Sequence, residues 1–238
     1  ISTQMIRFFI PIWCGIFFQQ IYITADAVII SKVGGESALT AVGCTSTFIN
    51  LLIGFFVGIG SGATVVIAQY FGARENDMVR RATHTALALA AIIGLSFMVL
   101  GLFITPWLLE LLQTPEDIFD MAVQYLRIYS LGMLPSVLYN MGSGILRAVG
   151  DSRHPLLYLA VASIVNIILD FTFVCGFHMG IAGVAIATIM AQAVSSFMVM
   201  HKLMHTREDY KVEIRKIRFH KKMIRKIIAF GFPAACQQ

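Results

Sequence analysis

The sequence predicts an all-α integral membrane protein: a six-transmembrane-helix bundle followed by a truncated seventh helix. Three observations lead to this fold class, namely the apolar composition, six long apolar runs, and loop charges that alternate along the chain. Of the 238 residues, 58% are hydrophobic and 13% are charged, and the mean hydropathy is +0.78. Soluble domains average about 45–50% apolar and about 25% charged residues. We therefore expect the chain to lie in a lipid bilayer.

Six apolar runs are long enough to cross a membrane, which takes about 20 residues. A seventh run begins near residue 226 and stops with the chain. We expect an N-terminal six-helix lobe (1–204), a cytoplasmic basic linker (205–225) and the start of a second lobe (226–238), and we interpret the chain as a fragment. The six complete runs cover residues 6–31, 39–71, 82–109, 119–146, 155–177 and 181–204.

The connections between these runs alternate in charge. Those after the second, fourth and sixth runs are basic, and ten of the eighteen Lys and Arg residues fall between Lys202 and Lys226. Those after the first, third and fifth runs contain Lys32 as their only cation. Cytoplasmic loops of membrane proteins carry an excess of Lys and Arg. The pattern predicts a multi-pass protein of the cytoplasmic membrane with a cytoplasmic N-terminus, and it argues against nucleic acid as a partner.

The linker segment RKIRFHKKMIRK (215–226) is basic and has apolar residues at helical spacing, and it is continued by Ile227. Such a pattern is typical of an amphipathic helix that lies on an anionic membrane surface. We therefore expect the apolar side chains of this segment to face the inner leaflet. They are Ile217, Phe219, Met223 and Ile227.

Three charged residues lie well inside the apolar runs, away from their ends: Asp26, Arg127 and Asp170. A carboxylate in mid-membrane costs about 2.5–3.5 kcal/mol on insertion scales, and such residues normally face a cavity and mark an ion or substrate path. The alternative for each acid is a static hydrogen bond between helices. The sequence by itself leaves both interpretations open.

The expected depth of the two acids in the membrane indicates whether they could belong to one site. Asp26, Asp170, Thr188 and Tyr125 each lie about seven residues from the outer end of a run, or about 10 Å below the outer surface at 1.5 Å per residue. Ser163, Asn166 and Asp170 share one helix face because they are spaced i, i+3, i+7. The sequence thus permits one polar chamber, open to the outside. Its oxygen atoms could bind Na⁺, or one acid could carry a proton.

Other polar features have simpler explanations. The GIGSG segment (58–62) lacks the strand–turn–helix context of a phosphate loop and is interpreted as small residues for close helix packing. His201 and His205 have a metal-like spacing but lie at a basic helix end, so we expect a solvated face. Pro11 and Pro135 interrupt the first and fourth runs and allow kinks. The sequence contains no Ser–His–Asp set, metal cluster or nucleotide motif, so we expect neither an enzyme nor a cofactor.

The chain resembles the multidrug and toxic compound extrusion (MATE) family. The resemblance implies two six-helix lobes that exchange cationic or polyaromatic compounds for H⁺ or Na⁺, with the present chain as the first lobe and the start of the second. It also implies a small-molecule substrate, contact with the bilayer, and a monomer at full length. The segments that carry it are QQIYITADAVIISKVG (19–34), VIAQYFGAR (66–74), YLRI (125–128), LRAVGDSRHP (146–155), NIILD (166–170) and GVAIATIMAQ (183–192).

The resemblance implies a first-lobe cation site made of Asp26, Asn166, Asp170 and Thr188, with Tyr125 adjoining it. It also implies that the first span bends near Pro11 when the site changes state. The sequence departs from the family at Ile23, where Asn is usual, and at Ala148, where Gly is common.

We therefore expect a cation-coupled exporter of drugs or metabolites that works by alternating access. One alternative is a flippase for lipid-linked oligosaccharides, which shares the two-lobed architecture but tends to carry more cationic residues in its cavity. A passive channel or a non-transporting membrane scaffold is the alternative from a different functional class of membrane protein. A scaffold has no need for two acids at matched depth, and a channel passes ions without stoichiometric exchange.

Overall fold

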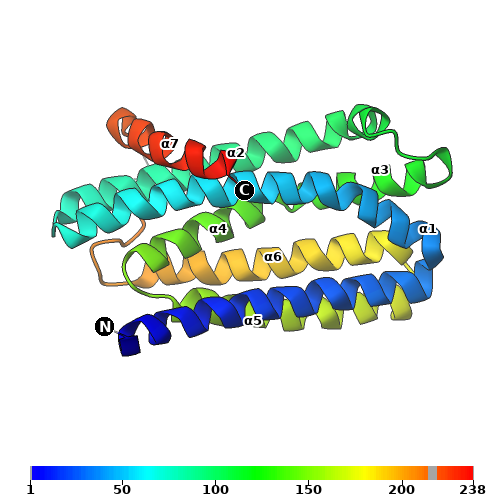
Figure 1. Ribbon diagram of the computed structural model, residues 1–238, viewed down its shortest axis with the longest axis horizontal. Helices are drawn as coiled ribbons and strands as arrows, with labels where there is room; N and C mark the ends of the chain where they lie inside the picture. The colour runs from blue at the N-terminus through cyan, green and yellow to red at the C-terminus, as the bar shows by residue number, and fades with distance from the viewer. Residues whose placement is uncertain (1, 214–218, 238) are drawn as a thin grey trace. The chain divides into compact units, whose positions relative to one another are not determined.

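The computed structural model describes the backbone of residues 2–213 and 219–237. Side chains are described from residue 35 onward in these ranges and, before that, at positions 17, 20, 21, 24 and 26–31. Every regular element of the described chain is a helix (Figure 1), which confirms the all-α fold class. In chain order the helices are α1 (Ser2–Gly72), α2 (Asn76–Leu111), α3 (Glu116–Leu131), α4 (Met133–Ala148), α5 (Arg153–Asp170), the π-helix η1 (Phe171–Gly176), α6 (Gly180–His205) and α7 (Lys221–Cys236).

A single residue separates the first two predicted spans. Gly35 has φ 72° and ψ −170°, so α1 consists of two helices joined at a break. Glycine adopts such a φ readily, whereas residues with a Cβ rarely do. A Cβ at Gly35 would meet nothing within 4 Å, so the backbone angle and not crowding favours glycine here. The connection is therefore shorter than the gap between residues 31 and 39 that the apolar pattern predicts.

The fourth predicted span is divided into α3 and α4 at Gly132. Pro135 explains the division, because it has no N–H to donate to the carbonyl of Leu131 and its ring would clash with that carbonyl in a continuous helix. The expectation that Pro135 interrupts this span is confirmed. A Cβ at Gly132 would lie only 2.9 Å from Cγ1 of Ile189. Glycine thus also lets the end of α3 approach α6.

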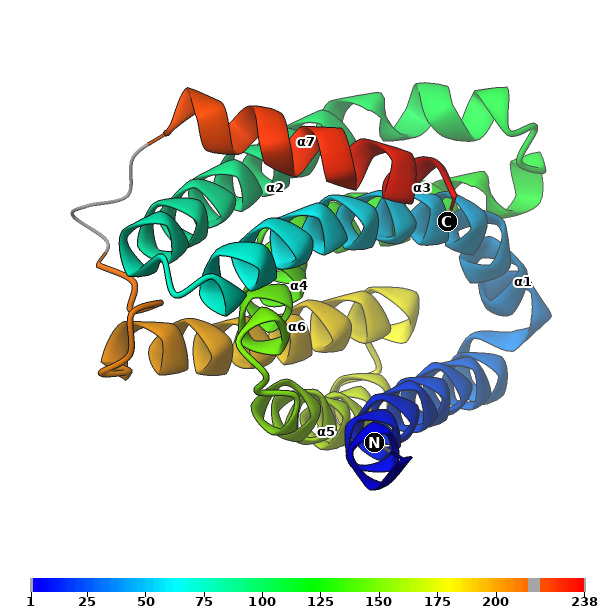
Figure 2. The same cartoon turned by 60° about the vertical axis from the view of Figure 1, so that its left-hand side comes forward.

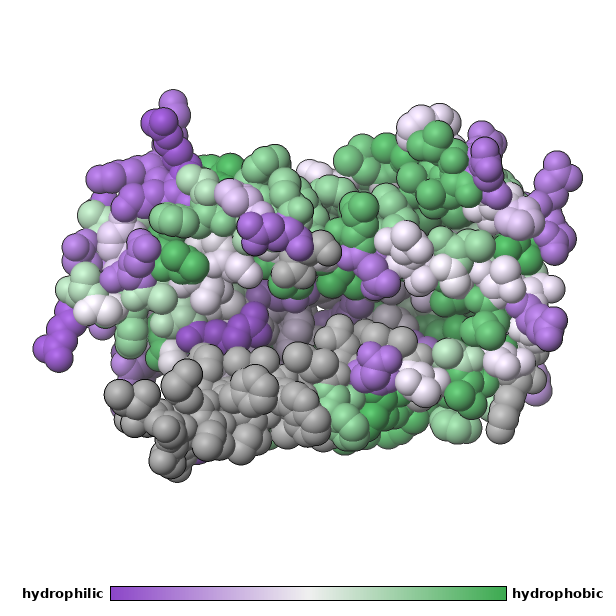
Figure 3. Space-filling view, viewed as in Figure 1, coloured by the Kyte–Doolittle hydropathy of each residue, from purple (hydrophilic) through white to green (hydrophobic). Residues whose placement is uncertain are grey.

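Among the residues that the structure describes, four helical stretches are long and apolar enough to cross a membrane by themselves: Gly35–Gly72, Asn76–Leu111, Arg153–Gly176 and Gly180–His205. Helices α3 and α4 have 16 residues each and together correspond to the fourth predicted span. Figure 3 shows one face of the molecule, on which hydrophobic residues cover broad areas and hydrophilic residues gather in separate patches. Broad exposed apolar areas are unusual in soluble proteins and are expected of a chain that contacts lipid.

The fifth predicted span changes its winding near its C-terminal end. Helix α5 ends at Asp170, and the next six residues, Phe171–Gly176, form the π-helix η1. The N–H of Phe177 donates to the carbonyl of Thr172 at 3.0 Å and closes this segment. Short π-helical segments are rare and are frequent at functional sites. The change of winding, which the sequence pattern did not indicate, directly follows a candidate acid.

The LRAVGDSRHP segment forms the turn between α4 and α5. Gly150 has φ 88°, and the N–H groups of Gly150 and Asp151 donate to the carbonyls of Arg147 (3.0 Å) and Leu146 (2.9 Å). This is the hydrogen-bond pattern of a helix that ends at a glycine. The carboxylate of Asp151 accepts the N–H of His154 at 3.2 Å and so caps the start of α5. The motif is therefore a compact turn that ends one helix and begins the next.

The helices form two compact units, each assembled from separate parts of the chain. The first unit comprises Ile1–Asn50, Leu95–Met133 and Leu156–Ser195, and the second comprises Leu51–Gly94, Leu134–Pro155 and Ser196–Gln238. In the first unit, the N-terminal half of α1 lies beside α5 (Figures 1 and 2). In the second unit, α7 lies beside α1 and α2 in both views.

The linker departs from the predicted amphipathic surface helix. Helix α7 begins at Lys221, and residues 214–218, which include Ile217, lie outside the described residues. Met223 and Ile227 are 2% and 0% exposed, so they do not face lipid. They are buried inside the second unit, where α7 packs along α1. Apolar periodicity could not distinguish these two outcomes, because a lipid surface and a protein core both accept apolar side chains.

Candidate functional site

Two acidic side chains meet inside the first unit. Asp26 lies on the N-terminal half of α1, and Asp170 is the last residue of α5. Their carboxyl groups are within hydrogen-bonding reach of each other. Asp170 is fully buried, and Asp26 is partly buried. The sequence placed the two acids at matched depth, and the structure brings their carboxyl groups close together.

The contact leaves several oxygen atoms of the two acids unsatisfied. Oδ1 of Asp26 and both carboxylate oxygens of Asp170 are buried and have no donor among the described residues. Neither acid forms an ion pair with a Lys, Arg or His among the residues that the structure describes. Ionised carboxylates only accept hydrogen bonds, and two of them at close range repel each other. The pair therefore needs a positive charge, which is either a shared proton or a bound cation.

Asn166 lies one helical turn before Asp170 on the same face of α5. It is 2% exposed, and neither its amide nitrogen nor its amide oxygen has a partner among the described residues. A buried polar group without a partner costs about 1–3 kcal/mol, so this position is suited to a bound species that supplies the missing interactions. Ser163 is also buried on α5, but its hydroxyl donates to the carbonyl of Leu159 at 2.9 Å.

Thr188 is buried on α6, where its hydroxyl donates to the carbonyl of Val184 at 3.0 Å. In the described chain, no hydrogen bond joins Thr188 to Asp26 or Asp170. A hydroxyl oxygen that donates its proton keeps its lone pairs. Thr188 can therefore ligate a cation and keep its bond to the helix backbone.

Tyr129 and Gln192 extend the polar site beyond the predicted residues. Nε2 of Gln192 donates to the Tyr129 hydroxyl at 3.4 Å, and Oε1 of Gln192 is buried and has no partner in the described chain. Tyr129 interacts electrostatically with Asp26 and stacks on Tyr125, with ring centroids 6.0 Å apart. Sequence reasoning identified Tyr125 and missed the other two. Helical spacing could have found them, because each lies four residues after a predicted site residue, Tyr125 or Thr188.

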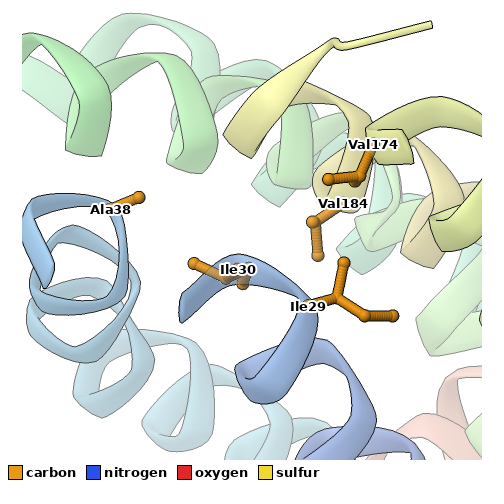
Figure 4. Close-up of a cluster of buried hydrophobic side chains, with 5 residues drawn as sticks. All are labelled: Ile29, Ile30, Ala38, Val174 and Val184. Atoms are coloured by element: carbon orange, nitrogen blue, oxygen red, sulfur yellow. The ribbon is translucent and has the colours of Figure 1, made fainter. Parts of the chain in front are cut away.

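An apolar cluster lies next to the acids. Ile30 follows Asp26 by four residues, and Val174 follows Asp170 by four. The cluster thus lies about one turn beyond each acid and keeps that side of the site apolar. Charges interact more strongly where water is excluded. The members of the cluster, which gather in one place in Figure 4, are Ile29, Ile30, Ala38, Val174 and Val184.

Two features that the sequence singled out are not placed in this site. Arg127 is exposed, so its side chain does not neutralise the acids, although it lies on the same helix as the buried Tyr125 and Tyr129. Pro11 falls within the range of α1, but its side chain lies outside the described residues, as does that of Ile23. The two acids that lie close together are buried or partly buried and offer negative charge and oxygen donors, and the amide of Asn166 and the hydroxyl of Thr188 are buried in the same unit.

This donor set favours a hard cation over a transition metal. Among the residues that the structure describes, no group of three or more His, Cys, Asp or Glu could hold a metal ion. Two carboxylates, one amide oxygen and one hydroxyl are oxygen ligands, which suit hard cations. The same carboxylates can bind a proton. The arrangement can therefore hold Na⁺ or H⁺, and Asp26 and Asp170 would contribute the charge.

Comparisons with known proteins agree with the observed fold, and the matched region of the chain includes both candidate acids. The MatE family model matches residues 11–172, a range that contains Asp26, Asn166 and Asp170. The probable multidrug resistance protein YpnP of Bacillus subtilis is 33% identical over 210 residues, which make up 85% of this chain and 47% of that protein.

Solved structures of transporters match the chain closely. The outward-facing conformation of a multidrug resistance MATE family transporter of the MOP superfamily gives a TM-score of 0.90 at 27% identity, covering 97% of this chain and 51% of that one. An inward-facing conformation of a multidrug resistance MATE family transporter gives a TM-score of 0.84 at 27% identity, covering 91% of this chain and 49% of that one. The chain thus spans about half the length of the relatives it matches. From the family match and these structures, the chain belongs to the MatE family, the MATE transporters, which are multi-pass membrane proteins and not enzymes.

Proposed function

We propose that this chain forms the cation-coupling part of an antiporter that exports cationic or polyaromatic compounds in exchange for H⁺ or Na⁺. The observation that carries the proposal is the buried contact between Asp26 and Asp170, which has no counter-charge among the described residues. A transporter that used these acids only to hold helices together would place a donor between them. A site that binds and releases a cation leaves that place for the cation.

The location of the acids links cation binding to helix packing. Asp26 is on α1 and Asp170 is on α5, and these helices lie side by side (Figure 1). When the site is empty, repulsion between two carboxylates favours separation of the helices, and a bound cation favours their contact. A ligand shifts an equilibrium only by its different affinity for the two states. Pro11 and Gly35 bound the segment of α1 that would move, with Pro11 as the proposed hinge.

Asn166 and Thr188 are proposed to orient the cation. The amide of Asn166 is buried without a partner in the described chain, and the lone pairs of the Thr188 hydroxyl are available. Tyr125, Ser163, Tyr129 and Gln192 are proposed to form the surrounding chamber wall.

The proposed orientation has a cytoplasmic N-terminus and loads the coupling cation from outside. It rests on the charges of the loops. The loops at 72–81 and 147–154 and the segment 202–226 are basic, whereas the loops that contain Glu36 and Asp117 are acidic. The relatives are about twice as long as this chain. We therefore propose that transport needs a second half that follows α7, with the exported compound bound between the halves, and that the complete unit works as a monomer.

The alternatives are less well supported. A flippase for lipid-linked oligosaccharides would favour cationic groups in its cavity, whereas the buried pair, Asp26 and Asp170, is acidic. A passive channel would conduct ions without an obligatory exchange, and it has no need for a buried pair of acids that must be neutralised.

The deciding experiment measures transport by the complete two-half protein in liposomes, with a pH gradient and a Na⁺ gradient imposed separately. Ethidium, an aromatic cation, serves as the transported probe. We expect one of the gradients to drive ethidium movement against the cation flow, and the 238-residue chain alone to give none. Dissipation of both gradients without ethidium transport would indicate a channel. Movement of a lipid-linked sugar without any ion gradient would indicate a flippase.

A further inference from the structure

The chain that follows α6 folds back onto the helices of the second unit. The N–H of Val212 donates to the carbonyl of Leu203, near the end of α6, at 2.9 Å, and the Val212 side chain is 2% exposed. Tyr210 is also buried. This segment is therefore packed against protein and is not a loop in solvent. We call residues 206–213 the strap.

Two adjacent residues of α2 hold the chain on its way to α7. Nε2 of His84 accepts the N–H of Glu213, the last residue of the strap, at 3.1 Å. The hydroxyl of Thr85 accepts the N–H of His220, the residue before α7, at 3.4 Å. His84 and Thr85 are 3% and 0% exposed, so water does not compete freely for these contacts.

The two contacts of His84 need opposite kinds of ring nitrogen. The carbonyl of Arg80 only accepts hydrogen bonds, so Nδ1 of His84, which lies 2.7 Å from it, must carry a proton. The N–H of Glu213 only donates, so Nε2 must present a lone pair. A neutral imidazole has one donor and one acceptor, whereas an imidazolium has two donors. The hydrogen bond to the strap therefore exists only while His84 is neutral.

The contact between Thr85 and His220 does not have this requirement. Thr85 donates its hydroxyl proton to the carbonyl of Arg81 at 2.7 Å, so its oxygen acts as the acceptor toward His220. Nδ1 of His220 lies 3.4 Å from that oxygen. It can donate there both in the neutral ring and in the charged ring. Protonation thus removes the His84 contact and leaves the Thr85 contact intact.

Helix α7 has further contacts that do not involve His84. A Cβ added to Gly62 on α1 would collide with the backbone of Gly231 on α7. The GIGSG segment therefore serves close helix packing, as the sequence predicts. Nζ of Lys226 also donates to the hydroxyl of Tyr70 at 2.7 Å. Helix α7 should therefore keep its place on α1 whether or not the strap is attached.

We propose that His84 is a proton-operated latch: it holds the strap on α2 while it is neutral and releases the strap when it takes a second proton, and α7 stays packed on α1. Histidine is the side chain that changes charge between about pH 5 and 8. If the linker lies in the cytoplasm, as proposed above, the latch responds to cytoplasmic pH. It does not depend on whether the transporter couples to H⁺ or to Na⁺.

Groups of both charge signs surround the latch. In the described chain, none of them forms an ion pair with His84. The carboxylate of Glu213 is the nearest along the strap, and if it accepted the new proton of His84, the strap would stay attached in acid. The titratable neighbours on α2, at the end of α6 and on the linker are Asp77, Arg80, Arg81, Lys202, His205, Lys211, Glu213 and His220.

Distances measured in the complete two-half protein test the latch. The native cysteines are replaced, and spin labels are attached at Asp77→Cys on α2 and Lys211→Cys on the strap, two exposed positions. A reference pair, Asp77→Cys with Arg225→Cys, reports on α7. Double electron–electron resonance then records both distances at about pH 8 and about pH 5.5. We expect the strap distance to lengthen and broaden in acid while the reference distance stays constant. A strap distance that is the same at both pH values would overturn the proposal.

Matched variants assign the change to one histidine. His84→Gln keeps an amide oxygen that can accept the N–H of Glu213 but cannot take a charge, so the strap distance should stay short at both pH values. His220→Gln is the control and should keep the wild-type response. A response to acid that survives in His84→Gln would contradict the latch.

A variant outside α2 decides the matter if His84→Gln fails to fold. Glu213→Pro removes the N–H that His84 accepts, so the strap should be detached at both pH values. A short distance at about pH 8 in this variant would overturn the proposal.

Proton binding at Asp26 and Asp170 must be separated from the latch. The distances are therefore also recorded in Asp170→Asn, where we expect the strap to respond to acid as in the wild type. A response that is lost in this variant would belong to the coupling site and would overturn the latch. Failure of the wild-type protein to transport under either gradient contradicts the proposed function instead and does not alter the strap response, so the two failures are distinguishable.

Discussion

The carboxyl groups of Asp26 on α1 and Asp170 on α5 lie close together, and neither has a cationic partner in the described chain. The contact joins two helices that are distant in sequence and neighbours in the first unit. A cation bound between the acids would interact with both helices at once. Occupancy of the site and packing of α1 against α5 would then be linked by one coupling free energy.

Asp170→Asn should separate coupling from folding. The amide can donate a hydrogen bond to Asp26 and so satisfies the contact without a cation, but it cannot bind a proton or neutralise Na⁺. In the complete protein we expect normal expression and an unchanged or higher melting temperature. Gradient-driven ethidium exchange in liposomes should fall about tenfold or more, which corresponds to a loss of at least about 1.4 kcal/mol.

The control for this variant is Asp117→Asn, an exposed acid at the start of α3, which should leave exchange unchanged. A static bridge between the helices predicts the opposite pattern: Asn would keep transport, and Ala would mainly lower stability. Wild-type exchange with intact cation dependence in Asp170→Asn would show that the site is assigned wrongly.

A cation that binds this site should stabilise the protein. A ligand present at 100 times its dissociation constant adds about 2.7 kcal/mol if it binds only the native state. We expect Na⁺ to raise the melting temperature more than choline does in the wild-type protein, but not in Asp26→Asn. If a proton is the coupling ion, Na⁺ and choline will give equal melting temperatures. An Asp26→Asn protein that responds to Na⁺ as the wild type does would place the cation elsewhere.

Thiol labelling should reveal the orientation in the membrane. Glu36 and Asp117 are exposed, and the loop charges predict that both face outward. Cysteines placed there, in a protein without its native cysteines, should react with an impermeant thiol reagent in intact cells. A cysteine at Arg153, which is exposed on the opposite predicted side, should react only after permeabilisation. Reversed labelling would overturn the proposed topology.

His84 should hold the linker against α2. Its Nδ1 lies 2.7 Å from the carbonyl of Arg80, and its Nε2 accepts the N–H of Glu213 at 3.1 Å. His84→Ala removes that acceptor, and the loss of one hydrogen bond between the linker and α2 costs about 0.5–1.5 kcal/mol. We expect faster trypsin cleavage within the linker and a lower melting temperature. His201→Ala, at an exposed position on α6, serves as control, and equal cleavage of both variants would contradict this role.

The sequence by itself determined the helical class, the approximate spans and the two acids. These are local properties, because a run of about 20 apolar residues crosses the hydrocarbon whatever its neighbours are. The division of the fourth span was also predictable, since Pro135 lacks an N–H wherever the helix lies. The gap that the sequence left between the first two spans contains Gly35, but the apolar pattern could not show that one residue makes the turn.

Only the tertiary structure decided which faces of the helices meet. Depth follows from position along a helix, but rotation about the helix axis follows from packing against other helices. This is why Asp26 meets Asp170, why Tyr129 and Gln192 join the site, and why Arg127 is exposed although it lies in the same apolar run as Tyr125. The burial of Met223 and Ile227 in the protein, and not in lipid, was also decided by tertiary structure. Lipid and protein interior are both apolar, so the choice between them was made by the close approach of α7 to α1.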